Sequence, residues 1–86
     1  MIRTTKIETP LGEMAAAATK EGICLLEFTS RPALESEFNR LALTFNETVK
    51  PGTNRHLRAL KKQLREYFRG KRREFTLDLV TPGTDF

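Results

Sequence analysis

The first third of the chain has the polar and apolar patterns of β-strands. Residues 2–8 alternate loosely and are rich in β-branched side chains, and the turn sequence TPLG follows at 9–12. Residues 13–19 hold four alanines but are too short for an independent helix between two turns, so they predict a strand whose small side chains let a neighbour pack close. Gly22 suits a left-handed position in the next hairpin. The almost continuously apolar run at 23–29 then predicts the central, most buried strand.

Two later stretches have apolar residues at helical spacing. The first predicts a helix that Ser30 caps and that has Pro32 in its first turn. Its stripe consists of Leu34, Phe38, Leu41, Ala42 and Phe45. The second predicts a longer helix, capped by Thr53 or Asn54 and followed by Gly70. Its stripe consists of Leu57, Leu60, Leu64, Tyr67 and Phe68.

The elements fall in the order β-β-β-α-(β)-α. Residues 45–49 fit either a short edge strand or a simple connection, and residues 75–80 alternate in the manner of an extended segment. A chain of 86 residues has the size of one small domain. We therefore expect an α+β fold in which two helices pack on a three-stranded antiparallel sheet.

Positive charge gathers in the second helix and the residues after it. Residues 55–75 hold nine of the fifteen Lys/Arg and two of the eleven acids, whereas the rest of the chain holds six and nine. Such polarity suits an anionic partner such as nucleic acid, and it suits an ordinary solvated face as well. The candidates for DNA contact are Lys61, Lys62, Arg65, Arg69, Lys71, Arg72 and Arg73.

Residues with catalytic or metal-binding chemistry are scarce. His56 is the only histidine and is expected as a partly packed surface residue, while Cys24 is expected as a small buried hydrophobe within an apolar strand. One cysteine and one histidine cannot complete a Cys/His metal cage, so no metal site is predicted. No cofactor and no catalytic residue is predicted either. Tyr67 and Phe68 could stack on bases if exposed, but their place in the apolar arc predicts core packing.

The chain has no apolar run of about 18 residues and no signal-peptide pattern, so no membrane partner is expected. The single cysteine cannot form an internal disulfide, which fits a reducing compartment. These observations predict a cytoplasmic location.

Four short motifs occur in order along the chain: TPLG at 9–12, EGIC at 21–24, YFRGKR at 67–72 with Phe75 and Leu77, and GTDF at 83–86. Together they resemble the methylated-DNA–protein-cysteine methyltransferases. The third is similar to the YFxGxRxxFxL signature ahead of the catalytic domain of that family, and the fourth to the GTxF that opens the catalytic domain. The resemblance spans the whole chain.

The resemblance implies an N-terminal, ribonuclease-H-like domain, which in that family has no catalytic residue of its own. The family's C-terminal domain carries a minor-groove helix-turn-helix, flips the damaged guanine out, and transfers the alkyl group from the guanine 6-oxygen to a cysteine in a PCHR motif. This chain has no PCHR sequence, Cys24 does not match that motif, and the zinc ligands of some relatives are missing. We expect residues 1–80 to form the domain and residues 81–86 to begin the linker to a missing catalytic domain, so that the chain ends at a domain boundary of a longer protein.

Three hypotheses about function follow. The leading one is the structural N-terminal domain of a DNA-repair suicide alkyltransferase, which supports its own catalytic domain, meets alkylated duplex DNA through the full-length protein and transfers no alkyl group alone. The alternative is a free-standing nucleic-acid-binding module that uses the basic residues. A third is an interaction module whose apolar tail, residues 75–86, docks on another protein.

Overall fold

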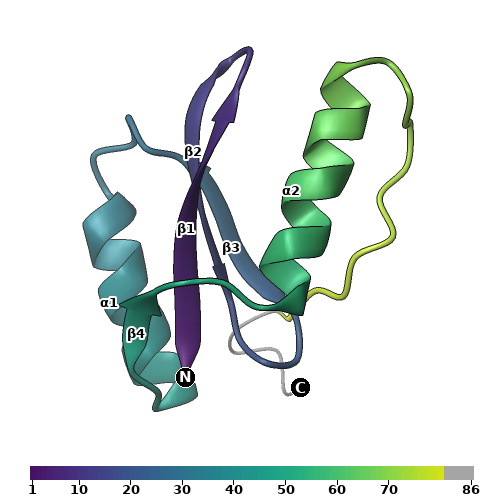
Figure 1. Ribbon diagram of the computed structural model, residues 1–86. Helices are drawn as coiled ribbons and strands as arrows, with labels where there is room; N and C mark the ends of the chain where they lie inside the picture. Colours follow the sequence, from purple (N-terminus) through teal and green to yellow (C-terminus); the bar gives the residue numbers. More distant parts are fainter. Residues whose placement is uncertain (81–86) are drawn as a thin grey trace.

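The computed structural model describes residues 1–80, which form a mixed four-stranded sheet between two helices (Figure 1). The strands are β1 (Ile2–Thr9), β2 (Gly12–Ala18), β3 (Ile23–Phe28) and β4 (Val49–Pro51), and the helices are α1 (Leu34–Phe45) and α2 (Arg55–Phe68). The α+β class and the packing of both helices on the sheet are as the sequence predicts. No helix among the described residues is long and apolar enough to cross a membrane.

The sheet has the strand order β3-β2-β1-β4. β1 pairs antiparallel with β2 from Arg3↔Ala18 to Thr9↔Gly12, and β2 pairs antiparallel with β3. β4 pairs parallel with β1, beginning at Ile2↔Val49. Of the two expectations for the inter-helix segment, the short edge strand is therefore confirmed, although it lies at 49–51 and makes the sheet four-stranded and mixed.

The prediction that residues 23–29 form the central, most buried strand is wrong. β3 lies at the end of the strand order, and five of its six residues are half-buried. Leu25 packs with the α1 side of the core, whereas Leu26 packs with the α2 side. The run is apolar because a helix covers each face of the sheet, and such coverage produces the same pattern as a position between two strands.

The central position belongs to the alanine-rich strand, β2. Ala15–Ala18 are all buried, with exposures of 3% or less. Ala16 and Ala18 belong to the cluster under α2, and Ala17 belongs to the cluster under α1. The small side chains let both helices approach the sheet closely, as the sequence predicts.

The two helices begin differently. α1 starts at Leu34 with Ala33 at the N-cap and no side-chain cap, so the predicted Ser30 cap is wrong. In α2, the side chain of Asn54 accepts a hydrogen bond from the Leu57 amide at 3.0 Å, and its own amide donates to the carbonyls of Ala18 and Thr19 at 3.4 and 3.2 Å. Asn54 therefore both caps α2 and ties its first turn to the end of β2.

Candidate functional site

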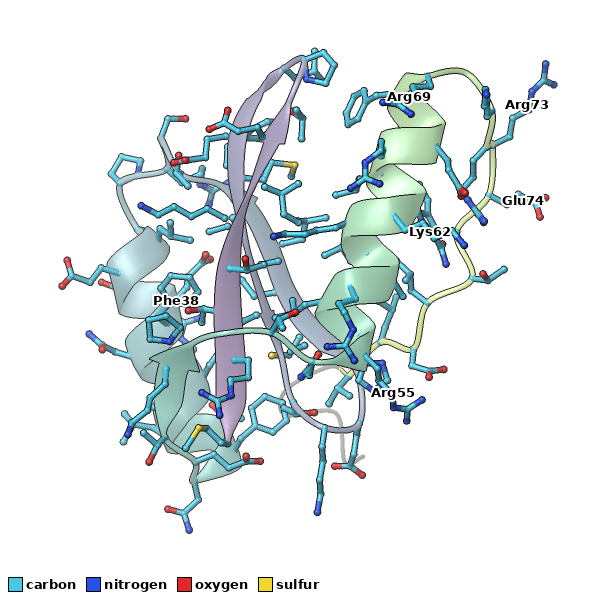
Figure 2. The ribbon with its side chains drawn as sticks, in the orientation of Figure 1. Phe38, Arg55, Lys62, Arg69, Arg73 and Glu74 are labelled. Carbon is cyan, nitrogen blue, oxygen red and sulfur yellow. The ribbon has the colours of Figure 1, made fainter. Side chains whose placement is uncertain are left out.

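The cationic surface of α2 is the first candidate site. Lys62, Arg65, Arg69, Lys71 and Arg73 are exposed and Lys61 is half-buried. Figure 2 shows Arg55 and Arg69 near opposite ends of α2, Lys62 between them, and Arg73 reaching outward from the segment that follows. Within residues 1–80, none of these cations lies within 4.0 Å of a carboxylate oxygen. Six of the seven predicted DNA-binding residues are thus available to an anionic partner.

Arg72, the seventh, is engaged within the domain. Its Nε donates to Glu66 Oε1 at 2.7 Å, and its Nη1 donates to the carbonyl of Glu74 at 2.9 Å. The hydrogen bond from Arg72, followed by smaller contributions from the cationic neighbours, holds the pKa of Glu66 below its ordinary value. Arg72 therefore fastens the segment after α2 to the helix.

This ion pair predicts a pH-dependent contribution to stability. Because the pKa of Glu66 is lower in the folded chain, the stabilisation is fully present above the ordinary pKa of Glu, about 4.3, and is lost as the pH falls through the folded value. Glu66→Gln should therefore lower the melting temperature at neutral pH, and the difference from the parent chain should shrink below about pH 4. Glu74→Gln is the matched control, and a difference that stayed constant in acid would contradict the assignment.

A groove lies between α2 and the β1–β2 hairpin, with a volume of about 360 Å³. Its apolar lining consists of Ile7, Pro10, Leu64 and Phe68. Lys61, Arg65 and Arg69 line it from α2, and Lys6 and Glu8 line it from β1. The groove therefore brings three of the predicted DNA-binding residues onto one apolar depression.

The second candidate site is the segment at 75–80, which runs back alongside α2 (Figure 1). Gln63 clamps it at Thr76: its Nε2 donates to the Thr76 carbonyl at 3.2 Å and hydroxyl at 3.1 Å, and its Oε1 accepts from the Thr76 amide at 2.9 Å. Further along, the Ile23 amide donates to the Asp78 carbonyl and the Val80 amide donates to the Ile23 carbonyl, both at 2.8 Å. The segment thereby joins the outer edge of β3 through a parallel bridge between Ile23 and Leu79.

The segment at 75–80 requires a glycine at position 22, because a side chain there would collide with it. The backbone of Gly22 is not left-handed. Positive φ occurs instead at Gly12, Gly52 and Gly70, so the predicted role of Gly22 is wrong, while the place of Gly70 just beyond α2 agrees with its φ of 75°. A Cβ at Gly22 would lie 2.6 Å from the Asp78 carbonyl oxygen. The absence of a side chain lets the segment approach β3.

His56 also faces this segment. The prediction of a partly packed surface residue is wrong, because the residue is only 5% exposed. Its Nε2 lies 3.0 Å from the carbonyl oxygen of Lys20, which can only accept, so Nε2 carries a proton. Its Nδ1 lies 3.9 Å from Asp78 Oδ2. The imidazole therefore joins α2 to the β2–β3 connection and lies beside the segment at 75–80.

The thiol of Cys24 lacks the environment of a nucleophile. It is half-buried and packs beside the α1 side of the core. Burial is the main cause that raises the pKa of this thiol, so the protonated form prevails. Within residues 1–80, no group of three His, Cys, Asp or Glu side chains is placed to hold a metal ion.

The aromatic residues at the end of α2 divide between core and surface. Phe68 is half-buried and packs against the core, as predicted, but Tyr67 is 46% exposed, so its predicted core packing is wrong. The Tyr67 ring lies edge-on to Phe68 at a centroid distance of 5.2 Å and beside Phe75 at 5.5 Å. Tyr67 and Phe75 are both exposed and form a small apolar patch at the end of α2.

Sequence reasoning missed the clamp formed by Gln63 and Thr76. One signal for it exists, since Gln63 is a polar residue three positions after Leu60 and adjacent to Leu64, on the buried side of an amphipathic helix. A polar side chain at such a position needs a hydrogen-bonding partner. The identity of the partner depends on the path of the chain after α2, which helical periodicity does not describe.

A family model described as 6-O-methylguanine DNA methyltransferase, ribonuclease-like domain, matches residues 2–81. The crystal structure of the Mycobacterium tuberculosis O6-methylguanine methyltransferase is 26% identical with a TM-score of 0.70, and a leucine-for-arginine variant of that enzyme is 27% identical with a TM-score of 0.65. Each match covers 100% of this chain and 46% of the other, so the chain spans about half the length of these proteins. No curated protein sequence matches the chain significantly.

Proposed function

The chain belongs to the 6-O-methylguanine DNA methyltransferase family, as its ribonuclease-like domain, and we propose that it is the scaffold half of a DNA-repair alkyltransferase. In this proposal residues 1–80 form the scaffold and residues 81–86, which lie outside the described residues, begin the linker to a catalytic domain. The partner of the scaffold is that domain, and the joined protein acts on alkylated duplex DNA in the cytoplasm. The relatives in the comparison are about twice as long, which leaves room for such a second domain.

The observation that carries the proposal is the way residues 76–80 are held. Three hydrogen bonds between Gln63 and Thr76, the two backbone bonds of Ile23 and the space above Gly22 fix the path of residues 76–80 from α2 to the edge of β3, where the described chain ends. A scaffold needs such a defined exit, because catalysis requires reacting groups to be positioned closely. The exposed rings of Tyr67 and Phe75 supply apolar surface for a second domain to cover.

The scaffold alone is expected to transfer no alkyl group. A nucleophilic cysteine needs a thiolate, and burial raises the pKa of the Cys24 thiol. Incubation with a fluorescent benzylguanine substrate should leave the chain unlabelled. Covalent labelling that Cys24→Ser abolished would show that the active site lies within this chain.

The coding sequence downstream of Phe86 tests the domain assignment separately. We expect it to continue in frame through a segment resembling QxxVW and then PCHR, the motif that carries the nucleophile in the family. A stop codon directly after Phe86 would contradict the scaffold proposal. The free-standing nucleic-acid-binding module would then be the better hypothesis.

A further inference from the structure

The groove between α2 and the β1–β2 hairpin combines a row of cations with an apolar floor. Lys61, Arg65 and Arg69 follow one another at four-residue intervals, which places them about 6 Å apart along the helix axis. None of the three lies within 4.0 Å of a carboxylate oxygen of residues 1–80. A row of this kind matches the regular charges of a nucleic-acid backbone.

The floor of the groove narrows the choice of ligand. It is formed by Ile7, Pro10, Leu64 and Phe68, and its volume of about 360 Å³ lies at the lower end of the range for small-molecule pockets. A duplex presents phosphates on a convex surface and keeps its bases stacked inside, so it gains little from an apolar depression. A single strand offers phosphates and unstacked bases together, and bases stack readily on aromatic rings.

We propose that this groove binds single-stranded nucleic acid, with phosphates along Lys61, Arg65 and Arg69 and a base against Phe68. The hairpin side of the groove carries one cation, Lys6, and one carboxylate, Glu8, so the net positive charge lies on α2 and the backbone runs along that side. This binding activity goes beyond the scaffold role and does not depend on it. A chain whose gene ended at Phe86 would still show it.

Fluorescence anisotropy with a labelled oligothymidine tests the proposal on the 86-residue chain. With three phosphates engaged, the logarithm of affinity should fall against the logarithm of salt with a slope of about −2 between about 50 and 200 mM. A duplex of the same length and a polyglutamate of similar charge serve as competitors. Both should compete at least about tenfold more weakly than unlabelled oligothymidine, because neither offers unstacked bases.

Charge reversal locates the site. Lys61→Glu, Arg65→Glu and Arg69→Glu together should weaken binding about 100-fold at low salt and bring the salt slope close to zero. The matched control reverses Lys20, Arg40 and Lys50, three exposed cations outside α2, and changes the net charge by the same amount. The control should retain affinity within about threefold.

Two single substitutions test base stacking on Phe68 and repulsion by Glu8 separately from the general attraction between cations and phosphates. Phe68→Leu keeps an apolar floor but should weaken binding about tenfold, because the stacking surface is lost. Glu8→Gln should tighten binding about threefold by removing the repulsive carboxylate. Thermal melting of each variant checks that the fold is retained.

Three results would overturn the proposal. The first is no binding at low salt, and the second is an equal loss of affinity in the control triple variant, which would reveal an effect of net charge alone. The third is equally strong competition by polyglutamate together with unchanged binding by Phe68→Leu, which would identify the groove as a site for acidic peptides. If Phe68→Leu fails to fold, the comparison of the two triple charge-reversal variants and the effect of Glu8→Gln still test the proposal.

Discussion

Gly22→Ala is expected to detach residues 78–80 from β3 and to lower the free energy of unfolding by about 2 kcal/mol. The new Cβ would lie 2.6 Å from the Asp78 carbonyl oxygen, 2.9 Å from its carbonyl carbon and 3.1 Å from Val80 Cγ2. Two of these neighbours are backbone atoms, which a rotamer change cannot move. The segment must therefore move away, and both hydrogen bonds of Ile23 to it are lost.

Urea unfolding and amide hydrogen exchange measure the two parts of this prediction. In the parent chain the amides of Ile23 and Val80 should be protected, and in Gly22→Ala both should exchange quickly while the β1–β2 amides stay protected. The matched control is Gly70→Ala. Gly70 has a φ of 75° with nothing within 4 Å of a new Cβ, so that variant should lose about 1 kcal/mol from backbone strain alone and keep the exit segment in place. Slow exchange at Ile23 in Gly22→Ala would contradict the account.

The contrast between these glycines shows what a sequence pattern could and could not predict. Gly70 follows an amphipathic helix, and its left-handed conformation is a local consequence of ending that helix. Gly22 looks like a hairpin glycine in the same local sense, but its function is to leave space for Asp78, more than fifty residues later. Close approach between distant segments leaves no periodic signal.

The same distinction separates the correct from the incorrect predictions about the core. The stripes of α1 and α2 were predictable because period 3.6 reports directly on which side of a helix is buried. The order of the strands in the sheet was not predictable, because the apolar run of β3 and the alanine run of β2 both indicate a strand that is covered on two faces. Strand order depends on which partners pair, and pairing is a long-range property.

The candidate site was predictable only in its charges. The polarised charge of α2 identified the cationic residues, and the motif resemblance identified the family. The groove needed the hairpin to fold beside α2, which brings Ile7 and Pro10 next to Phe68. Arg72 and Glu66 are six residues apart on either side of a helix end, so their ion pair depends on the path of the chain beyond Gly70.

Ala16→Leu is expected to cost about 3 kcal/mol of unfolding free energy. Ala16 is fully buried between Thr5 of β1 and Leu26 of β3, and it lies in the same cluster as Leu57 and Leu60 of α2. Three additional carbon atoms have no space there, since protein interiors are packed to crystalline density. The helix must rise from the sheet, which also exposes neighbouring apolar surface. Urea unfolding measures the loss.

The matched control is Ala33→Leu, which adds the same atoms at an exposed position before α1 and should change stability by less than about 0.5 kcal/mol. A second substitution then tests the mechanism. If α2 is the obstacle, Leu57→Ala should be destabilising alone but should partly relieve Ala16→Leu, because together the two changes conserve core volume. The double variant would then be more stable than the sum of the single losses predicts. Strictly additive losses would mean that the leucine at position 16 meets some obstacle other than α2, and that the alanines of β2 do not set the distance between helix and sheet.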